Sequence, residues 1–155
     1  MPPIQGTTEV FHVRPKFLVK IDGFSSAQFS KCSAIEAEIE IAKYRQGGQL
    51  HETKIPTLVT FPDVTLERGS TKDKDFYNWF RDAANAATGT GLVEPNFRRT
   101  VDIVQLDRDN KALQRWRLFR AFPQKFTAGE WDNNSAEVVM TMLTIAYERF
   151  ELFNA

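Results

Sequence analysis

The sequence predicts a mainly β, or α+β, domain that contains about six to eight strands and one central helix. Three observations lead to this class. β-Branched and aromatic residues dominate most segments, residues 34–43 alternate between apolar and acidic side chains, and residues 73–87 show helical spacing. The chain has 155 residues, a length that fits one domain with a sizeable core, so residues 1–155 are treated as a single domain.

Composition narrows the function classes. The 20 Lys and Arg residues balance 20 Asp and Glu residues, whereas nucleic-acid binders usually carry a basic excess. One cysteine and two histidines exclude an internal disulfide and argue against a metal centre or another cofactor site. We interpret Cys32 as a buried, inert thiol. No signal peptide or membrane-spanning run is visible, so we expect no membrane anchor and synthesis in a reducing cytoplasm.

The first third of the chain is strand-rich. Residues 1–8 are rich in Pro, Gly and Thr and predict an N-terminal arm without regular structure. Residues 10–21 predict a strand that Pro15 kinks or restricts to a sheet edge, followed by a turn at Asp22 and Gly23. A short second strand is expected over residues 27–33.

Residues 34–43 show the clearest alternation in the chain. The apolar residues fall on one face of the expected third strand, and Glu36, Glu38 and Glu40 fall on the other. Simple alternation favours a solvated acidic face over paired catalytic carboxylates.

A long polar segment, residues 46–56, follows this strand. It contains Gly47 and Gly48 and separates two strand-like stretches, so it predicts a hairpin loop much longer than a hairpin requires. Such a loop is either mobile or functional. Strand character resumes over residues 57–61 and 64–67.

The expected helix covers residues 73–87. Phe76, Trp79 and Phe80 lie on one helical face, which should pack on the sheet, while Lys74, Arg81 and Asp82 should stay on the exterior. Ser70 or Thr71 can cap its start and Gly89 its end.

Further strands are expected over residues 99–106, 112–123 and 135–153, after a Gly-rich connection over residues 88–95. Both faces of the last strand are substantially apolar. Its second cover is either the other sheet of a β-sandwich or a neighbouring subunit.

No catalytic constellation is visible. The chain lacks a Gly-x-Ser-x-Gly motif, and Gly89-Thr90-Gly91 follows the helix instead of opening one, which argues against a phosphate-binding loop. We therefore expect that the protein is not an enzyme.

Several segments, in this order and spacing, resemble the tail tube proteins of contractile phages and phage-like injection machines. They are FSKCS (29–33), KYRQGG (43–48), LVTFPDVTLERG (58–69), DFYNWF (75–80), WRLFRAFPQKF (116–126), Trp131-Asp132 and AYERFE (146–151). The resemblance covers nearly the whole chain. One departure is Thr57, which stands after Pro56 where the family leads us to expect glycine.

The resemblance implies a small β-barrel-like fold of two packed antiparallel sheets with one flanking helix. It further implies homohexameric rings that stack into a tube, with DNA or protein cargo, or a tape measure, in the lumen. A contractile sheath, a baseplate and a tail terminator are the implied partners. Assembly would occur in the bacterial cytoplasm, and the product would be a virion tail or an injection particle. Alternatives are an initiator or terminator ring, a secretion-system tube related to haemolysin-coregulated protein, and an effector-binding ring.

This resemblance also gives expectations for particular residues. We expect the loop at 46–56 to contact a neighbouring subunit or ring, and we expect the acidic face of the third strand to line the lumen, with an outer or intersubunit surface as the alternative. The helix exterior is the expected sheath contact. The residues concerned are Gly47, Gly48, Gln49, Leu50, His51, Glu52 and Lys54 in the loop, Glu36, Glu38 and Glu40 on the strand, and Lys74, Arg81 and Asp82 on the helix.

Overall fold

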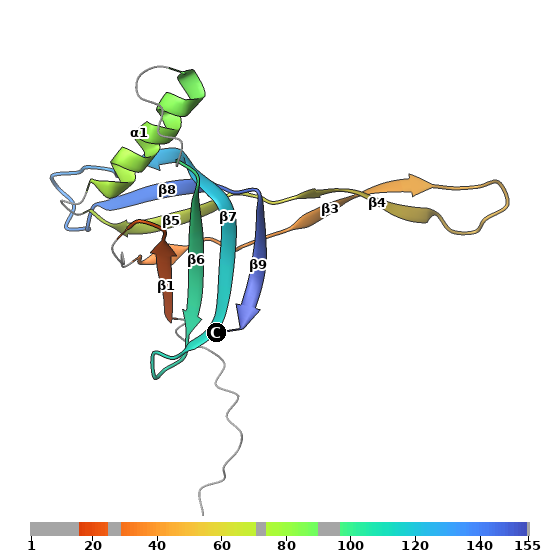
Figure 1. Ribbon diagram of the computed structural model, residues 1–155, viewed down its shortest axis with the longest axis horizontal. Helices are drawn as coiled ribbons and strands as arrows, with labels where there is room; N and C mark the ends of the chain where they lie inside the picture. The colour runs from red at the N-terminus through yellow and green to blue at the C-terminus, as the bar shows by residue number, and fades with distance from the viewer. Residues whose placement is uncertain (1–15, 25–28, 71–73, 90–96, 155) are drawn as a thin grey trace, which may run out of the picture.

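The computed structural model describes residues 16–24, 29–70, 74–89 and 97–154 (Figure 1). The expected arm at 1–8, the expected strand before residue 16 and the Gly-rich connection fall wholly or largely outside these residues. The elements are β1 (Lys16–Ile21), β2 (Lys31–Cys32), β3 (Glu38–Tyr44), β4 (Thr53–Thr60), β5 (Val64–Gly69), α1 (Asp75–Thr88), β6 (Arg99–Leu106), β7 (Ala112–Thr127), β8 (Met140–Ala146) and β9 (Arg149–Asn154).

Two antiparallel sheets share the long strand β7. Its first part pairs with β6 and β9, and β1 lies on the far side of β6. Its last part pairs with β8, which continues through β5 to β2. Arg120, near the point where β7 passes from one sheet to the other, has a φ of 52°. This bend lets one strand serve both sheets, and the expected class of two packed sheets with a flanking helix is confirmed.

The core lies between the sheets and under α1. Alternate residues of β5 are buried, and so are Leu143 and Ile145 of β8, as the period of two in a half-covered strand requires. The largest fully buried side chains come from both sheets and the helix: Trp79, Phe76, Leu66, Leu118, Leu143, Ile145, Val19, Val64 and Val101.

The helix begins at Asp75 and ends at Thr88, within two residues of the expected range. Lys74 occupies the N-cap position without a side-chain cap bond, and Gly89 ends the helix in the left-handed conformation. Phe76 and Trp79 are buried, and the indole Nε1 of Trp79 donates a 2.6 Å hydrogen bond to the carbonyl oxygen of Phe97. The expected packing of this helical face on the sheet is therefore correct.

Several expected strand boundaries are wrong. The single final strand over residues 135–153 is two strands, because the chain turns at Tyr147 and Glu148 and β9 then pairs with β7. Glu148 holds this corner: its backbone N–H donates to the carbonyl oxygen of Phe119, and its carboxylate accepts from Arg98 and Arg120 at 3.2 and 3.1 Å. On β8, the face with Leu143 and Ile145 is buried within the chain, while Met140, Met142 and Ala146 on the other face are half-buried.

The second wrong boundary concerns the long loop. Residues 53–56 belong to β4, so the connection between β3 and β4 is residues 45–52. Strand β3 also starts later than expected, at Glu38, and β2 covers only Lys31–Cys32.

Candidate functional site

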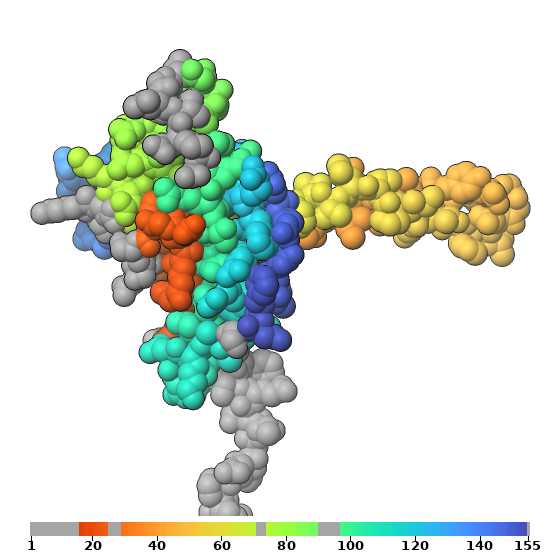
Figure 2. Space-filling model, in the orientation of Figure 1, coloured from red at the N-terminus to blue at the C-terminus, as the bar shows by residue number. Residues whose placement is uncertain are grey.

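Strands β3 and β4 form a two-stranded hairpin that extends away from the body of the molecule (Figures 1 and 2). Every residue of both strands is exposed. An isolated two-stranded hairpin is only marginally stable in water. This hairpin projects from the body, and in the part of the chain that the structure describes its two strands pair only with each other. It is therefore the outstanding candidate for a binding element.

Apolar side chains are numerous on the hairpin. Ile39 and Ile41, which the alternation placed on one face of β3, are each 53% exposed, and Leu58 is 58% exposed. The period of two was correctly predicted, but no layer formed by the described residues covers the apolar side. Exposed apolar patches of this kind mark interaction surfaces. The other exposed large apolar residues of the hairpin are Tyr44, Leu50, Ile55 and Val59.

The register of the two strands assigns residues to faces. Ile39 pairs with Val59, Ile41 with Pro56 and Lys43 with Lys54, so these six side chains share one face, here called the apolar-basic face. Glu38 and Glu40 lie on the opposite face, across from Thr60 and Leu58.

The root of the hairpin is anchored to the body by aromatic residues. The Phe61 ring lies 6.1 Å from the Tyr147 ring and 5.4 Å from the Phe150 ring. The Tyr147 hydroxyl donates to the carbonyl oxygen of Glu36 over 3.5 Å. Burial, reinforced by the charges of Asp63 and Glu36, raises the pKa of Tyr147 to about 12. The root from which the hairpin extends is therefore well packed against the body.

The tip of the hairpin is a compact turn. Gly48 has a φ of 90°, the backbone N–H of Gln49 donates to the carbonyl oxygen of Gln46 at 3.2 Å, and Arg45 donates from Nε to the carbonyl oxygen of Gln49 at 3.2 Å. The expected loop residues Gly47, Gly48, Gln49, Leu50, His51 and Glu52 lie at this tip, and Lys54 lies in β4.

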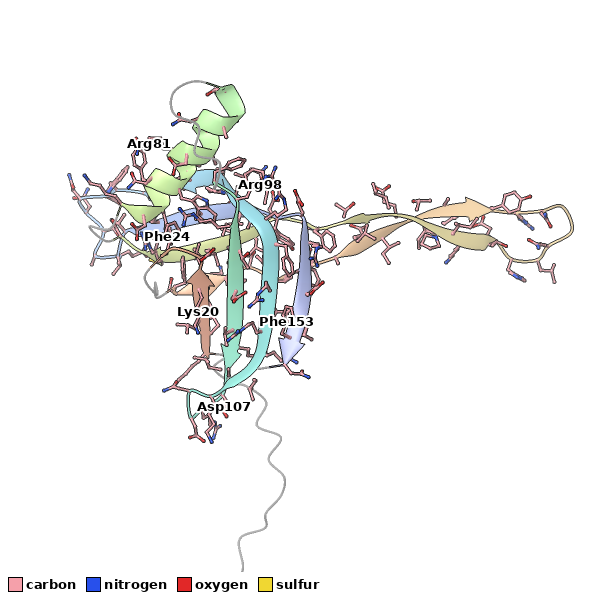
Figure 3. The ribbon with its side chains drawn as sticks, in the orientation of Figure 1. Lys20, Phe24, Arg81, Arg98, Asp107 and Phe153 are labelled. Atoms are coloured by element: carbon pink, nitrogen blue, oxygen red, sulfur yellow. The ribbon has the colours of Figure 1, made fainter. Side chains whose placement is uncertain are left out.

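The remaining expected site residues lie on other parts of the surface. Glu36 precedes β3 at the hairpin root, so the three glutamates follow the proximal part of the hairpin. Arg81 is exposed on α1, where its guanidinium lies 6.0 Å from the Tyr77 ring, and Figure 3 labels it on the helix. Lys74 is exposed at the helix start, and Asp82 is half-buried. The structure does not bring the loop residues, the strand glutamates and the helix residues together into one site. Their expected roles stay predictions.

Chemical reactivity is limited at Cys32. Its side chain is half-buried, and burial raises the pKa of the thiol to about 11. Across the described segments, no group of three His, Cys, Asp or Glu side chains could hold a metal ion. The described helix is also neither long nor apolar enough to cross a membrane.

Comparison with protein families shows which family the chain belongs to. Residues 13–151 match the family model described as T4-like virus tail tube protein gp19. The chain belongs to this tail tube family. The resemblance stated from sequence segments is thereby confirmed, and the function of the protein is that of a tail tube protein.

Solved structures share the fold of this tail tube protein. A chain of the anti-feeding prophage baseplate superposes with a TM-score of 0.75 at 19% identity, covering 90% of this chain and 93% of that one. A chain of the sheath–tube complex of an extracellular contractile injection system, PVC, gives 0.74 at 18% identity, with coverages of 90% and 89%. Hcp1 from Flavobacterium johnsoniae gives 0.58 at 16% identity, with coverages of 90% and 95%. A comparison with curated proteins finds no match.

The sequence expectations missed the exposed apolar residues of the hairpin. Alternation showed which side chains share a face of β3, but it carries no information on whether anything covers that face. Pro56 was the available signal, because a proline within a strand indicates an edge or a bulge and not the middle of a buried sheet.

Proposed function

We propose that the tail tube protein forms homohexameric rings that stack into the inner tube of a contractile particle, and that the β3–β4 hairpin makes contacts between subunits. The observation that carries the proposal is the hairpin. It projects from the body and exposes a row of apolar side chains, and among the described strands its two strands pair only with each other. Contact with another subunit would remove these side chains from water, which is favourable at about 25 cal/mol per Å².

The remaining partners follow from the same role. Chains of similar fold occur in a baseplate, a tube-terminating cap and a sheath–tube complex. For this chain we propose a baseplate and a terminator at the tube ends, a sheath outside and cargo or a tape measure in the lumen. The protein would act by geometry alone, without catalysis, after assembly in the bacterial cytoplasm.

Shortening the hairpin tests the proposal. Ala42 and Ile55 are directly paired, so residues 43–54 can be replaced by Asn-Gly to close a shorter hairpin at that pair. We expect this variant to stay folded and soluble because the removed residues lie outside the core. It should no longer form tubes in electron micrographs, whereas the full chain forms them at the same concentration.

Two results would contradict the proposal. Normal tubes from the shortened variant would show that the hairpin is not an assembly element. A full chain that stops at single rings would favour the alternative of an initiator or terminator, because an end ring does not polymerise.

A further inference from the structure

The distal part of the hairpin is basic. It contains three basic residues, Lys43, Arg45 and Lys54, and only one acidic residue, Glu52. Lys43 and Lys54 face each other directly across the two strands, an arrangement of like charges that destabilises an isolated ladder. Among the described residues, none of the ion pairs involves the hairpin. Carboxylates of a partner surface would attract both lysines and offset the repulsion between them.

A cleft of complementary character lies on the body. It has a volume of about 300 Å³ and combines acidic with apolar side chains: Glu67, Glu130, Asp132, Ser135, Glu137, Val138, Val139, Met140 and Met142. No Lys or Arg is among these lining residues, and Val138 is 73% exposed. This surface is here called the acidic cleft.

The hairpin and the acidic cleft lie at opposite ends of the same sheet. Strand β5 begins at Val64, shortly after β4 ends at Thr60, and its last residue, Gly69, pairs with Met140 at the cleft. Figure 1 shows the hairpin on one side of the body and the segment that precedes β8 on the other. At about 3.3 Å per residue, the six residues of β5 separate the two ends by roughly 17–20 Å. A hairpin that points away from the cleft cannot fill the cleft of its own chain.

We propose that the apolar-basic face of the hairpin docks into the acidic cleft of a second copy of this chain. Ile39, Ile41 and Val59 would then meet Val138, Met140 and Met142, while Lys43 and Lys54 would meet the carboxylates of the cleft. Because the two surfaces differ, the contact is heterologous and propagates head to tail. The proposal rests on the proposed self-assembly and adds to it the acceptor site for the hairpin.

Charge reversal tests the contact. We would compare the variant K43E/K54E, the variant E130K/E137K and the chain that carries all four changes, with Lys111→Glu in the exposed β6–β7 turn as a charge control. All of these positions are exposed, so the melting temperatures should match that of the unaltered chain. Polymer would be measured by sedimentation and electron microscopy at 0.15 M salt, where surface charges are only partly screened.

Each two-residue variant should raise the concentration needed for polymer by about tenfold or more, since like charges then oppose each other. The four-residue variant should return to within about threefold of the unaltered chain, and Lys111→Glu should have no effect. Treatment of assembled polymer with a zero-length carbodiimide reagent should link Lys43 or Lys54 to the cleft carboxylates between chains.

The outcomes separate this contact from self-assembly itself. If the shortened hairpin abolishes tubes but both charge reversals assemble normally, the acidic cleft is not the acceptor and the tube function stands. Cross-links from the hairpin lysines to carboxylates elsewhere would likewise overturn the docking site. A full chain that never polymerises would overturn both proposals.

Discussion

The Thr57 hydroxyl donates a 3.0 Å hydrogen bond to the backbone carbonyl oxygen of Glu40, across the hairpin. The strand register shifts at this point, because Glu40 pairs with Leu58 while Ile41 pairs with Pro56, so Thr57 is the extra residue of a β-bulge. Pro56 has no N–H to give to the ladder, and a bulge is one of the few places in a sheet that tolerates proline. The threonine at this position, where the family resemblance suggested glycine, thus has a defined partner.

Replacing Thr57 tests whether this bond organises the hairpin. Thr57→Val removes the hydroxyl and keeps the branched shape, and Thr57→Ser keeps the hydroxyl as the matched control. We expect Thr57→Val to change the global stability by less than about 1 kcal/mol, because the bond is exposed. Hydrogen exchange of the hairpin amides should accelerate in Thr57→Val and not in Thr57→Ser. Equal exchange in both variants would show that the bond does not restrain the strands.

The helix depends on one buried side chain. Trp79 is 1% exposed, packs edge-on against Phe24 at 5.5 Å and donates to the carbonyl oxygen of Phe97. Trp79→Ala should therefore lower the free energy of unfolding by about 3–5 kcal/mol, measured in urea. The free energy of unfolding of Trp79→Phe should lie between those of Trp79→Ala and the unaltered chain. Arg81→Ala, at an exposed position, should leave it nearly unchanged. An unaltered melting temperature in Trp79→Ala would contradict the packing of α1.

An ion pair links the two central strands of one sheet. Arg117 donates from Nε and Nη2 to the two carboxylate oxygens of Asp102 at 2.8 and 3.2 Å, and the two residues are directly opposite each other in β6 and β7. Asp102→Asn should destabilise the fold only modestly, since it removes a charge-assisted pair but leaves Arg117 with access to water. A double-mutant cycle with Arg117→Gln measures the coupling, and a value near zero would refute it.

Alkaline pH should destabilise the fold through two groups. Burial raises the pKa of Cys32 from 9.0 to about 11 and is the main cause that raises the pKa of Tyr147 from 10.0 to about 12. Both groups become charged when they lose a proton, and burial disfavours the charged form in the folded chain. The unfolded chain therefore loses these protons at lower pH than the folded chain does. Stability is therefore fully present below about pH 9 and declines as pH rises to about 12.

The measurement is the free energy of unfolding in urea from pH 8 to 11.5. Cys32→Ala and Tyr147→Phe should each make stability decline less steeply with pH. In the folded protein, the alkylation rate of Cys32 should rise with pH and reach half of its maximum near pH 11. A midpoint near pH 9 would contradict the burial of the thiol.

The sequence predicted elements best where a strong local pattern coincides with burial. Residues 99–106 were expected as a strand and are β6 without change, and the helix differs by two residues at its start. The break at Tyr147 and Glu148 carries no glycine or proline. The chain turns there because β9 returns along β7, and Glu148 contacts Arg98 and Arg120, which lie far away in the sequence. Local patterns cannot show a turn that distant residues impose.

The candidate site was predictable only in outline. The polar segment with Gly47 and Gly48 indicated a long connection, but its second part is the strand β4, because Thr53–Thr60 pairs along the whole of β3. The acidic cleft left only a partial local signal. Eight of its nine lining residues lie within residues 130–142, but Glu67 joins them only through the pairing of β5 with β8.

Cryo-electron microscopy of the particles that the purified full chain forms tests the central claim most directly. We predict stacked rings around a central channel, with the β3–β4 hairpin of each subunit buried against another copy. A chain that remains monomeric at every concentration, or tubes in which the hairpin projects into solvent without touching another subunit, would contradict it.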